Sequence, residues 1–251
     1  MDVNRFKLIA PPDLPSYRTL AGDIADASWP EFMMHDPIAN EHWHELFDRF
    51  NEYQFALFDT ENKRMAAMAN SLPFYWDQPL ENLPETGWDW VFLKAIEDHQ
   101  NGVTPNIQSA VQINIHPDYQ GHGLSARMVQ AMGAIGKSKG FRHLVAPVRP
   151  NQKSKYPLTN IDDYIRWTNA EGLPFDAWLR VHVRVGANII KPCHEAMFIR
   201  GSRAEWENWT SLKFLQSGEY VVAGALNPIR MNMEKDEGIY IEPNVWMVHE
   251  L

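Results

Sequence analysis

The chain has a single cysteine, Cys193, and no long run of apolar residues. A lone cysteine excludes an internal disulfide framework and a zinc site built from several cysteines. No stretch approaches the roughly 20 apolar residues that a membrane-spanning helix requires. Met1 to Lys7 hold no apolar run of the signal-peptide type. We therefore expect a cytoplasmic protein with no membrane association and no metal site.

The charge is acidic overall but unevenly distributed. The 251 residues include 23 Lys+Arg and 32 Asp+Glu, a formal net charge of −9, which makes nucleic acid an unlikely partner. However, no Asp or Glu occurs between Gln120 and Asn160. That window holds seven basic residues: Arg127, Lys137, Lys139, Arg142, Arg149, Lys153 and Lys155. Such a local excess indicates a partner that carries phosphates, the alternative being a solvated helix face and a basic loop.

Hydrophobic spacing and turn residues predict alternating helices and strands. Helices are expected over 15–27, from an Asn40 cap to Phe50, from Trp88 towards Gly102, over 160–172 and over 204–209. Strands are expected over 53–58, 64–69, 188–199 and 229–233, near Tyr220 and over 240–248, with an irregular stretch over 72–87. The segment 175–185 fits either a strand or one face of a helix, and periodicity does not decide between them.

The centre of the chain has the pattern of a βαβ unit. Ile107 to Ile115 form a predicted strand that Pro117 ends, and a glycine-bearing loop leads into an amphipathic helix from Leu124 to Gly140. Leu144 to Val148 form the next strand. This order predicts an α/β fold with a mixed or parallel sheet.

The loop Gln120-Gly121-His122-Gly123-Leu124-Ser125 can bind phosphate. Glycines let backbone N–H groups turn towards one point, and the positive end of the helix dipole adds to their attraction for phosphate oxygens. No Gly-Lys-Ser/Thr follows, so the loop is not a P-loop. Ala126 stands at the third glycine position, so it is not the dinucleotide-binding fingerprint either. A purely structural turn is the alternative interpretation.

Here the sequence resembles the GNAT superfamily of N-acetyltransferases. Their central motif is Gln/Arg-x-x-Gly-x-Gly/Ala, and this chain offers Gln120, Gly123 and, as a departure, Ser125. The flanking segments 111–117, 124–129 and 140–142 also match. The resemblance is clear over 53–71 and 105–150 and weaker to about 200. It implies one GNAT-like domain over 1–251, with a central mixed sheet splayed between its fourth and fifth strands and insertions near 72–104, 151–175 and 201–240.

The resemblance also implies a donor site for acetyl-coenzyme A or another acyl-coenzyme A. The diphosphate would bind the amides of Gly121, His122, Gly123, Leu124 and Ser125, next to Gln120. The pantetheine arm would lie along Ile113, Asn114 and Ile115. Asn151 stands where members often place a pantetheine-binding asparagine, and Lys153 and Lys155 could reach the adenosine 3′-phosphate.

Acyl transfer to an amine needs a base for the amine and an acid for the leaving thiolate. Many members place a tyrosine four residues before the glycine of a Gly-Phe pair. Gly186 matches that glycine, so His182 is the candidate acid, since a histidine pKa lies near 6.5. The base stays open: Ser109 replaces the glutamate of some members, His116 is expected to cap the strand end, and His194 and Glu195 could face the cleft. Cys193 as an acyl-carrying nucleophile is a minor option.

The predicted function is transfer of an acyl group from coenzyme A to an amine of a small molecule, by direct attack in a ternary complex. Basic peptides are alternative acceptors. A carrier-protein thioester or an aminoacyl-tRNA could replace the donor, and the fold could instead serve as a non-catalytic acyl-coenzyme A sensor. The oligomeric state is open, with a homodimer as one option.

Overall fold

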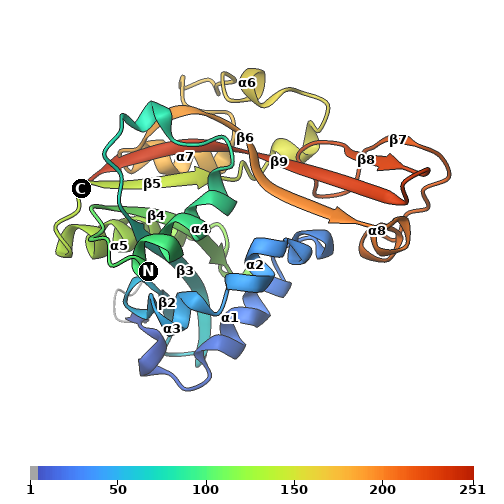
Figure 1. The fold of residues 1–251 in the computed structure, drawn as a ribbon. Helices are drawn as coiled ribbons and strands as arrows, with labels where there is room; N and C mark the ends of the chain where they lie inside the picture. The colour runs from blue at the N-terminus through green and yellow to red at the C-terminus, as the bar shows by residue number, and fades with distance from the viewer. Residues whose placement is uncertain (1–4) are drawn as a thin grey trace.

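The computed structural model describes residues 5–251, which form a mixed sheet with helices on both faces (Figure 1). In the described chain the sheet runs in the order β1-β2-β3-β4-β5-β9-β8-β7, and β6 pairs with the other edge of β9. The strands are β1 (Phe6–Ile9), β2 (Phe55–Asp59), β3 (Arg64–Phe74), β4 (Ile107–Ile115), β5 (His143–Val148), β6 (Asn188–Gly201), β7 (Gly218–Tyr220), β8 (Ile229–Asn232) and β9 (Glu237–Glu250).

Successive side chains of each strand point to opposite faces of the sheet, and helices cover both faces. The helices are α1 (Tyr17–Asp26), α2 (Pro37–His42), α3 (Glu45–Asp48), α4 (Gly87–Gln100), α5 (Leu124–Ser138), α6 (Ile161–Tyr164), α7 (Ala177–Arg184) and α8 (Arg203–Thr210). On β5, Val145 packs in the cluster that includes α4, whereas Leu144 packs with α5 and Ala146 with α7. Buried apolar side chains therefore pack against both faces of β5.

The predicted splay between the fourth and fifth strands is present. β4 and β5 are parallel but pair only at Gln108–Leu144 and Ser109–Val145. Beyond these pairs the two strands separate. A β-bulge coincides with the separation, because Asn70 pairs with Gln112 and Ser71 with Ala110, which leaves Val111 opposite no residue of β3.

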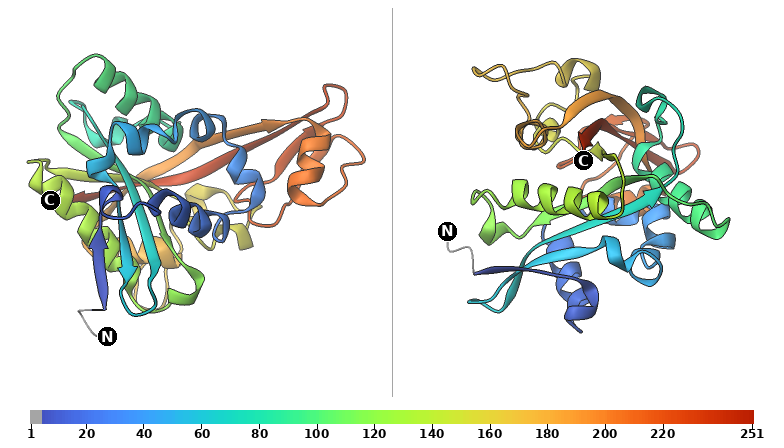
Figure 2. Two further views of the ribbon diagram at one scale, coloured as in Figure 1. Left: turned by 90° about the horizontal axis from the view of Figure 1, so that it is seen from below. Right: turned by 90° about the vertical axis from the view of Figure 1, so that its left-hand side faces the viewer.

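The long strands β6 and β9 extend beyond the body of the protein as an arm (Figure 1, right; Figure 2, left). Their outer halves pair with each other, and β8 and β7 add to the edge of β9. Helix α8 closes the arm with the wholly buried Trp206, whose indole N–H donates to the Gly238 carbonyl at 2.9 Å. The range 201–240, where we expect an insertion, contributes α8, β7 and β8 to this outer part.

The structure differs from the sequence expectations at four points and resolves one ambiguity. The short edge strand β1 was not expected, and β3 extends to Phe74, into the stretch expected to be irregular. The helix expected from Asn40 begins at Pro37 with Asp36 as its cap, and a break separates α2 from α3. The helix expected over 160–172 ends at Tyr164. The ambiguous segment 175–185 forms the helix α7. Within residues 5–251, no helix combines the length and apolar character needed to cross a membrane.

Candidate active site

The glycine loop lies exposed at the entrance to α5. Gly121 and Gly123 adopt φ values of +77° and +74°, which an L-residue rarely adopts. Added Cβ atoms at either position would meet nothing within 4 Å, so the space beside the loop is open. No side chain caps the helix, and its first N–H groups have no intrahelical partner. The loop therefore presents free amides and the positive end of a helix dipole, a suitable site for phosphate.

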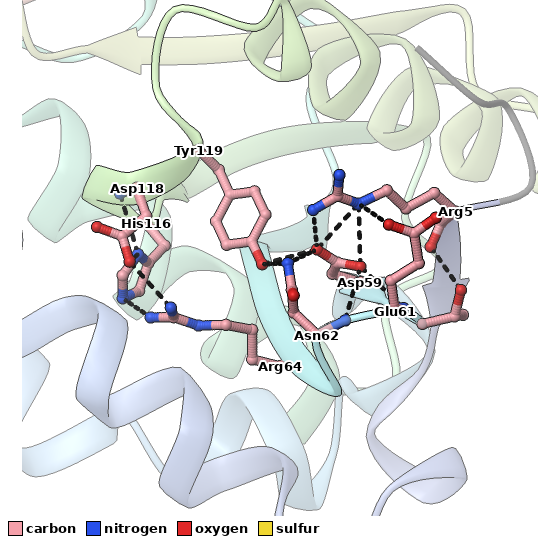
Figure 3. Close-up of polar contacts among 9 residues, drawn as sticks. Arg5, Asp59, Glu61, Asn62, Arg64, His116, Asp118 and Tyr119 are labelled. Carbon is pink, nitrogen blue, oxygen red and sulfur yellow. Dashed lines mark hydrogen bonds and ion pairs between the residues drawn. The ribbon is translucent and has the colours of Figure 1, made fainter.

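A buried ion pair anchors the turn that precedes this loop (Figure 3). Asp59 is inaccessible to solvent and accepts hydrogen bonds from Arg5 Nη2 at 2.6 Å, Tyr119 Oη at 2.8 Å and Asn62 Nδ2 at 2.8 Å. On the other side of the turn, Arg64 contacts both His116 and Asp118. The network fixes the turn at Pro117–Tyr119 to β2 and β3, so it holds the glycine loop in place.

Acid should weaken this anchor. The hydrogen bonds from Arg5, together with those from Tyr119 and Asn62, hold the pKa of Asp59 well below its ordinary value. A depressed carboxyl pKa stabilises the fold above the ordinary value of about 4, and the contribution is lost as the pH falls through the folded value. Asp59→Asn should therefore flatten the fall in unfolding free energy below about pH 4, as measured by urea unfolding at several pH values. Asp118→Asn, in an exposed pair, is the control and should keep the wild-type slope; an unchanged slope in Asp59→Asn would contradict the assignment.

The open edge of β4 is the second feature of the site. The His116 N–H donates to the Ala66 carbonyl, so the backbone groups of His116, and by alternation those of Asn114, face β3. Those of Ile113 and Ile115 consequently face the splay, where β5 has separated. The Ile115 carbonyl accepts a hydrogen bond from the Gln120 side chain, at 3.3 Å. This edge can accept an extended ligand in the manner of an added strand.

The first turn of α4 covers the splay. The Trp88 indole N–H donates to the carbonyl of the bulge residue Val111 at 2.8 Å. A Cβ on Gly87 would lie 2.3 Å from Cys193 Sγ and 3.4 Å from the Pro147 side chain, so only glycine fits there. The helix thus begins directly above the strands β4, β5 and β6.

A chain of polar side chains lines the same face of the sheet at the open end of the splay. With its side-chain oxygen turned towards the indole, Asn114 accepts from Trp29 Nε1 at 2.9 Å and from Gln112 at 3.2 Å. The Arg149 guanidinium stacks over the Trp29 ring and bonds the buried Glu242 through Nε, at 2.8 and 2.9 Å. Asn114 is therefore occupied by the protein, and its expected contact with pantetheine is not supported by its position.

His182 lies on α7 and is buried beneath Trp178. Its Nδ1 lies 2.9 Å from His249 Nε2, and burial together with His249 lowers the pKa of His182 to about 3. The imidazole is therefore neutral at physiological pH in this conformation. Its role as the acid remains a prediction, and it requires the ring to gain a proton during turnover.

Four of the seven basic residues in the window make contacts within the protein. Lys153 is wholly buried, donates to the carbonyls of Tyr156 and Leu226, and has its pKa lowered by burial to about 8. Its ammonium does not lie where an external phosphate can reach it, so the expected contact with the adenosine 3′-phosphate is not supported. Arg127 donates to the Phe6 carbonyl, and Lys139 pairs with Glu52. Asn151 is exposed and accepts from the Trp178 N–H at the start of α7.

The remaining candidates have local structural roles. His116 caps the turn after β4, as expected, by accepting from the Asp118 N–H. His194 is half-exposed between Glu85 and Asp162. Cys193 is buried with its thiol against the Glu85 carbonyl, and burial raises its pKa to about 12, which opposes a role as a thiolate nucleophile.

Sequence reasoning did not identify the carboxyl groups of Asp36, Asp89 and Glu242, which the fold brings together near Arg149. They come from the cap of α2, the first turn of α4 and the middle of β9. No spacing along the chain links them. The one signal was the predicted insertion near 72–104, which contains Asp89.

Comparison with known proteins identifies the fold and one related protein. No protein-family model matches the chain. It is 29% identical over 249 residues to the arginine N-acetyltransferase avaD of Aspergillus versicolor, covering 89% of this chain and 85% of that protein. Among solved structures, the loading GNATL domain of CurA from Lyngbya majuscula matches with a TM-score of 0.62 and 20% identity, covering 98% and 97% of the two chains. The GphF GNAT-like decarboxylase in complex with isobutyryl-CoA matches with a TM-score of 0.55 and 12% identity, covering 98% of each chain. The chain therefore has the GNAT fold, and its predicted resemblance to the GNAT superfamily N-acetyltransferases is confirmed.

Proposed function

We propose that this protein transfers an acyl group, with acetyl as the first candidate, from coenzyme A to an amine of a small molecule. One observation carries the proposal: the exposed glycine loop, with its free amides, adjoins the unpaired edge of β4 at the splay. A diphosphate can bind the amides of Gly121 to Ser125 while an extended amide-containing arm bonds Ile113 and Ile115. Coenzyme A combines these two groups with a thioester at the end of the arm.

The reaction is a direct acyl transfer. The neutral amine nitrogen attacks the thioester carbonyl carbon, a C–N bond forms, and the C–S bond breaks as the tetrahedral intermediate collapses. The amine loses one proton to a base, and the thiolate gains one from an acid. The buried Cys193 has no part in this scheme.

The printed name of the relative supplies the first acceptor to test. Since avaD is named an arginine N-acetyltransferase, L-arginine is the reference amine, and other basic amino acids follow. The acidic character of the chain is consistent with a positively charged acceptor.

The proposal is tested first by donor binding. Acetyl-coenzyme A binds only the folded protein, so it should raise the melting temperature; saturation at 100 times Kd corresponds to about 2.7 kcal/mol. Free thiol released in the presence of L-arginine then measures transfer. A shift without thiol release for any amine would indicate a sensor, and no shift with any acyl-coenzyme A would reject the donor assignment.

His182→Ala is expected to lower kcat by about 100-fold or more if the imidazole donates the proton to the thiolate. The KM for acetyl-coenzyme A should change little, because the proposed diphosphate and pantetheine contacts lie on the glycine loop and β4 rather than on α7. His182→Gln is the control: it can keep a hydrogen bond to His249 without supplying the proton. Full activity of His182→Gln would show that the residue only supports packing, and the pH profile of kcat in the wild type should report the acid.

A further inference from the structure

We propose that the buried carboxyl groups of Asp36 and Asp89 bind the positively charged group of the acceptor, a guanidinium or an ammonium. This inference rests on the proposed acyl transfer and assigns the acceptor side of the same site. The substrates of this protein would then be organic cations that carry a separate amine.

The two carboxyl groups meet beneath the first turn of α4. Asp36 is inaccessible to solvent; its Oδ1 accepts from the Ala39 N–H at 2.8 Å, and its Oδ2 has no hydrogen-bond partner. Asp89 Oδ2 accepts from the Phe198 N–H at 3.2 Å, and its Oδ1 has no partner. The two side chains lie within hydrogen-bond reach of each other. Without a cation the two carboxyl groups can therefore share a proton, and the N–H groups of a bound cation would take the place of that proton.

The charges around this pair do not balance. Glu242 lies close enough to raise the pKa of both aspartates, but its own partners are Arg149 and the Tyr240 hydroxyl. The remaining Arg149 nitrogen, Nη2, donates to the Gly224 carbonyl at 2.7 Å. Within residues 5–251, no Lys or Arg forms an ion pair with Asp36 or Asp89. Burial raises the pKa of both carboxyl groups, and the neighbouring Asp36 raises that of Asp89 further. A bound cation would remove this penalty.

A second observation, independent of the carboxyl groups, points to a ligand rich in N–H donors. Within the part of the chain that the structure describes, three buried amide oxygens on the same sheet face have no partner: Asn70 Oδ1, Gln112 Oε1 and Asn244 Oδ1. Asn70 and Asn244 are each 1% exposed. Their orientations are fixed, because Asn70 Nδ2 donates to Gln54 and Asn244 Nδ2 to the Pro147 carbonyl, each at 3.1 Å. Leaving a buried hydrogen-bond acceptor without a donor costs free energy. The N–H groups of a bound amine substrate can supply the donors that this side of the splay lacks.

The position of the Asp36–Asp89 pair relative to the donor site fits a subsite for the acceptor amine. Trp88, adjacent to Asp89, bonds the bulge residue Val111 of β4, where the strands separate. A cation held by Asp36 and Asp89 therefore lies on the α4 side of the splay. Among the described residues, no three His, Cys, Asp or Glu side chains are grouped to hold a metal ion. A guanidinium or ammonium with several N–H donors suits two adjacent carboxyl groups.

The test compares matched acceptors on matched variants. The acceptors are L-arginine against neutral L-citrulline, and L-lysine against neutral L-norleucine, with acetyl-coenzyme A as donor. The variants are Asp36→Asn, Asp89→Asn and the exposed control Asp77→Asn. Asparagine caps a helix as well as aspartate does, so Asp36→Asn should fold. Each variant is first checked for a wild-type melting temperature and a wild-type shift with coenzyme A.

Wild type should prefer at least one cation over its neutral partner by about 10- to 100-fold in kcat/KM. Asp36→Asn and Asp89→Asn should lose that preference with the KM for acetyl-coenzyme A unchanged, and Asp77→Asn should retain it. The pair that shows the preference distinguishes guanidinium from ammonium. Normal donor binding and transfer with no preference in wild type, or a preference unchanged in both variants, would overturn the subsite alone. No coenzyme A shift in wild type would reject the proposed function and the subsite together.

Discussion

Replacing Gly123 by valine is expected to abolish binding of coenzyme A while leaving the protein folded. Gly123 adopts φ +74° at the cap of α5, and a Cβ there would project into open space beside the exposed amides. A β-branched residue disfavours this conformation and obstructs the approach of a diphosphate. Losing two charge-assisted hydrogen bonds should weaken binding by about 100-fold or more, which isothermal titration calorimetry measures directly.

The same helix offers a matched control. Gly140, just beyond its other end, adopts φ +79° and is equally free of neighbours within 4 Å. Gly140→Val therefore introduces the same backbone strain without touching the amides of the loop. It should lose similar stability yet bind coenzyme A with the wild-type Kd. Equal loss of binding in both variants would mean that strain alone explains the Gly123 result.

Replacing Arg149 by methionine is expected to destabilise the fold by about 3–5 kcal/mol at neutral pH. The change leaves Glu242, which is inaccessible to solvent, without the guanidinium whose Nε bonds both of its carboxylate oxygens. Burial already raises the pKa of Glu242 above its ordinary value even with Arg149 present. Urea unfolding gives the loss of free energy.

Two further results separate this explanation from simple loss of packing. The double variant Arg149→Met/Glu242→Gln removes the buried charge and should recover most of the loss. In Arg149→Met alone, the folded state binds a proton at Glu242 more tightly than the unfolded state, so stability lost at neutral pH should return as the pH falls towards about 4.3. A double variant no more stable than the single one would contradict the buried-charge account.

The βαβ unit could be predicted because its signals are local. Pro117 follows the end of β4, glycines precede α5, and Gly140 follows its end. Turn residues and hydrophobic periodicity therefore predict the same element boundaries over 107–148. The splay itself could be predicted only from the family resemblance. Its physical basis is a two-residue pairing of β4 with β5 and a bulge at Val111, neither of which leaves a sequence pattern.

The segment 175–185 shows where periodicity fails. Leu179, Val181 and Val183 alternate as in a strand, yet the segment is the helix α7. Asp176 supplies the deciding signal, because its side chain accepts the Trp178 and Leu179 N–H groups as an N-cap. The Asp36-Pro37 pair at the start of α2 is a similar capping signal.

The donor side of the candidate site could be proposed from the sequence, whereas the acceptor side could not. A glycine loop is contiguous, so its residues are visible together. Asp36, Asp89 and Glu242 lie far apart along the chain and meet only through the packing of α2, α4 and β9. Lys153 illustrates the reverse case. It lies in the basic window of the sequence, but its ammonium donates to two backbone carbonyls inside the protein.

The most direct measurement is a crystal structure of this protein with bound coenzyme A. We expect the diphosphate on the amides of Gly121 to Ser125 and the pantetheine arm along Ile113 and Ile115, with its thiol in the splay between β4 and β5. A carrier bound at any other surface, or a glycine loop with its amides turned away from the diphosphate, would contradict the account.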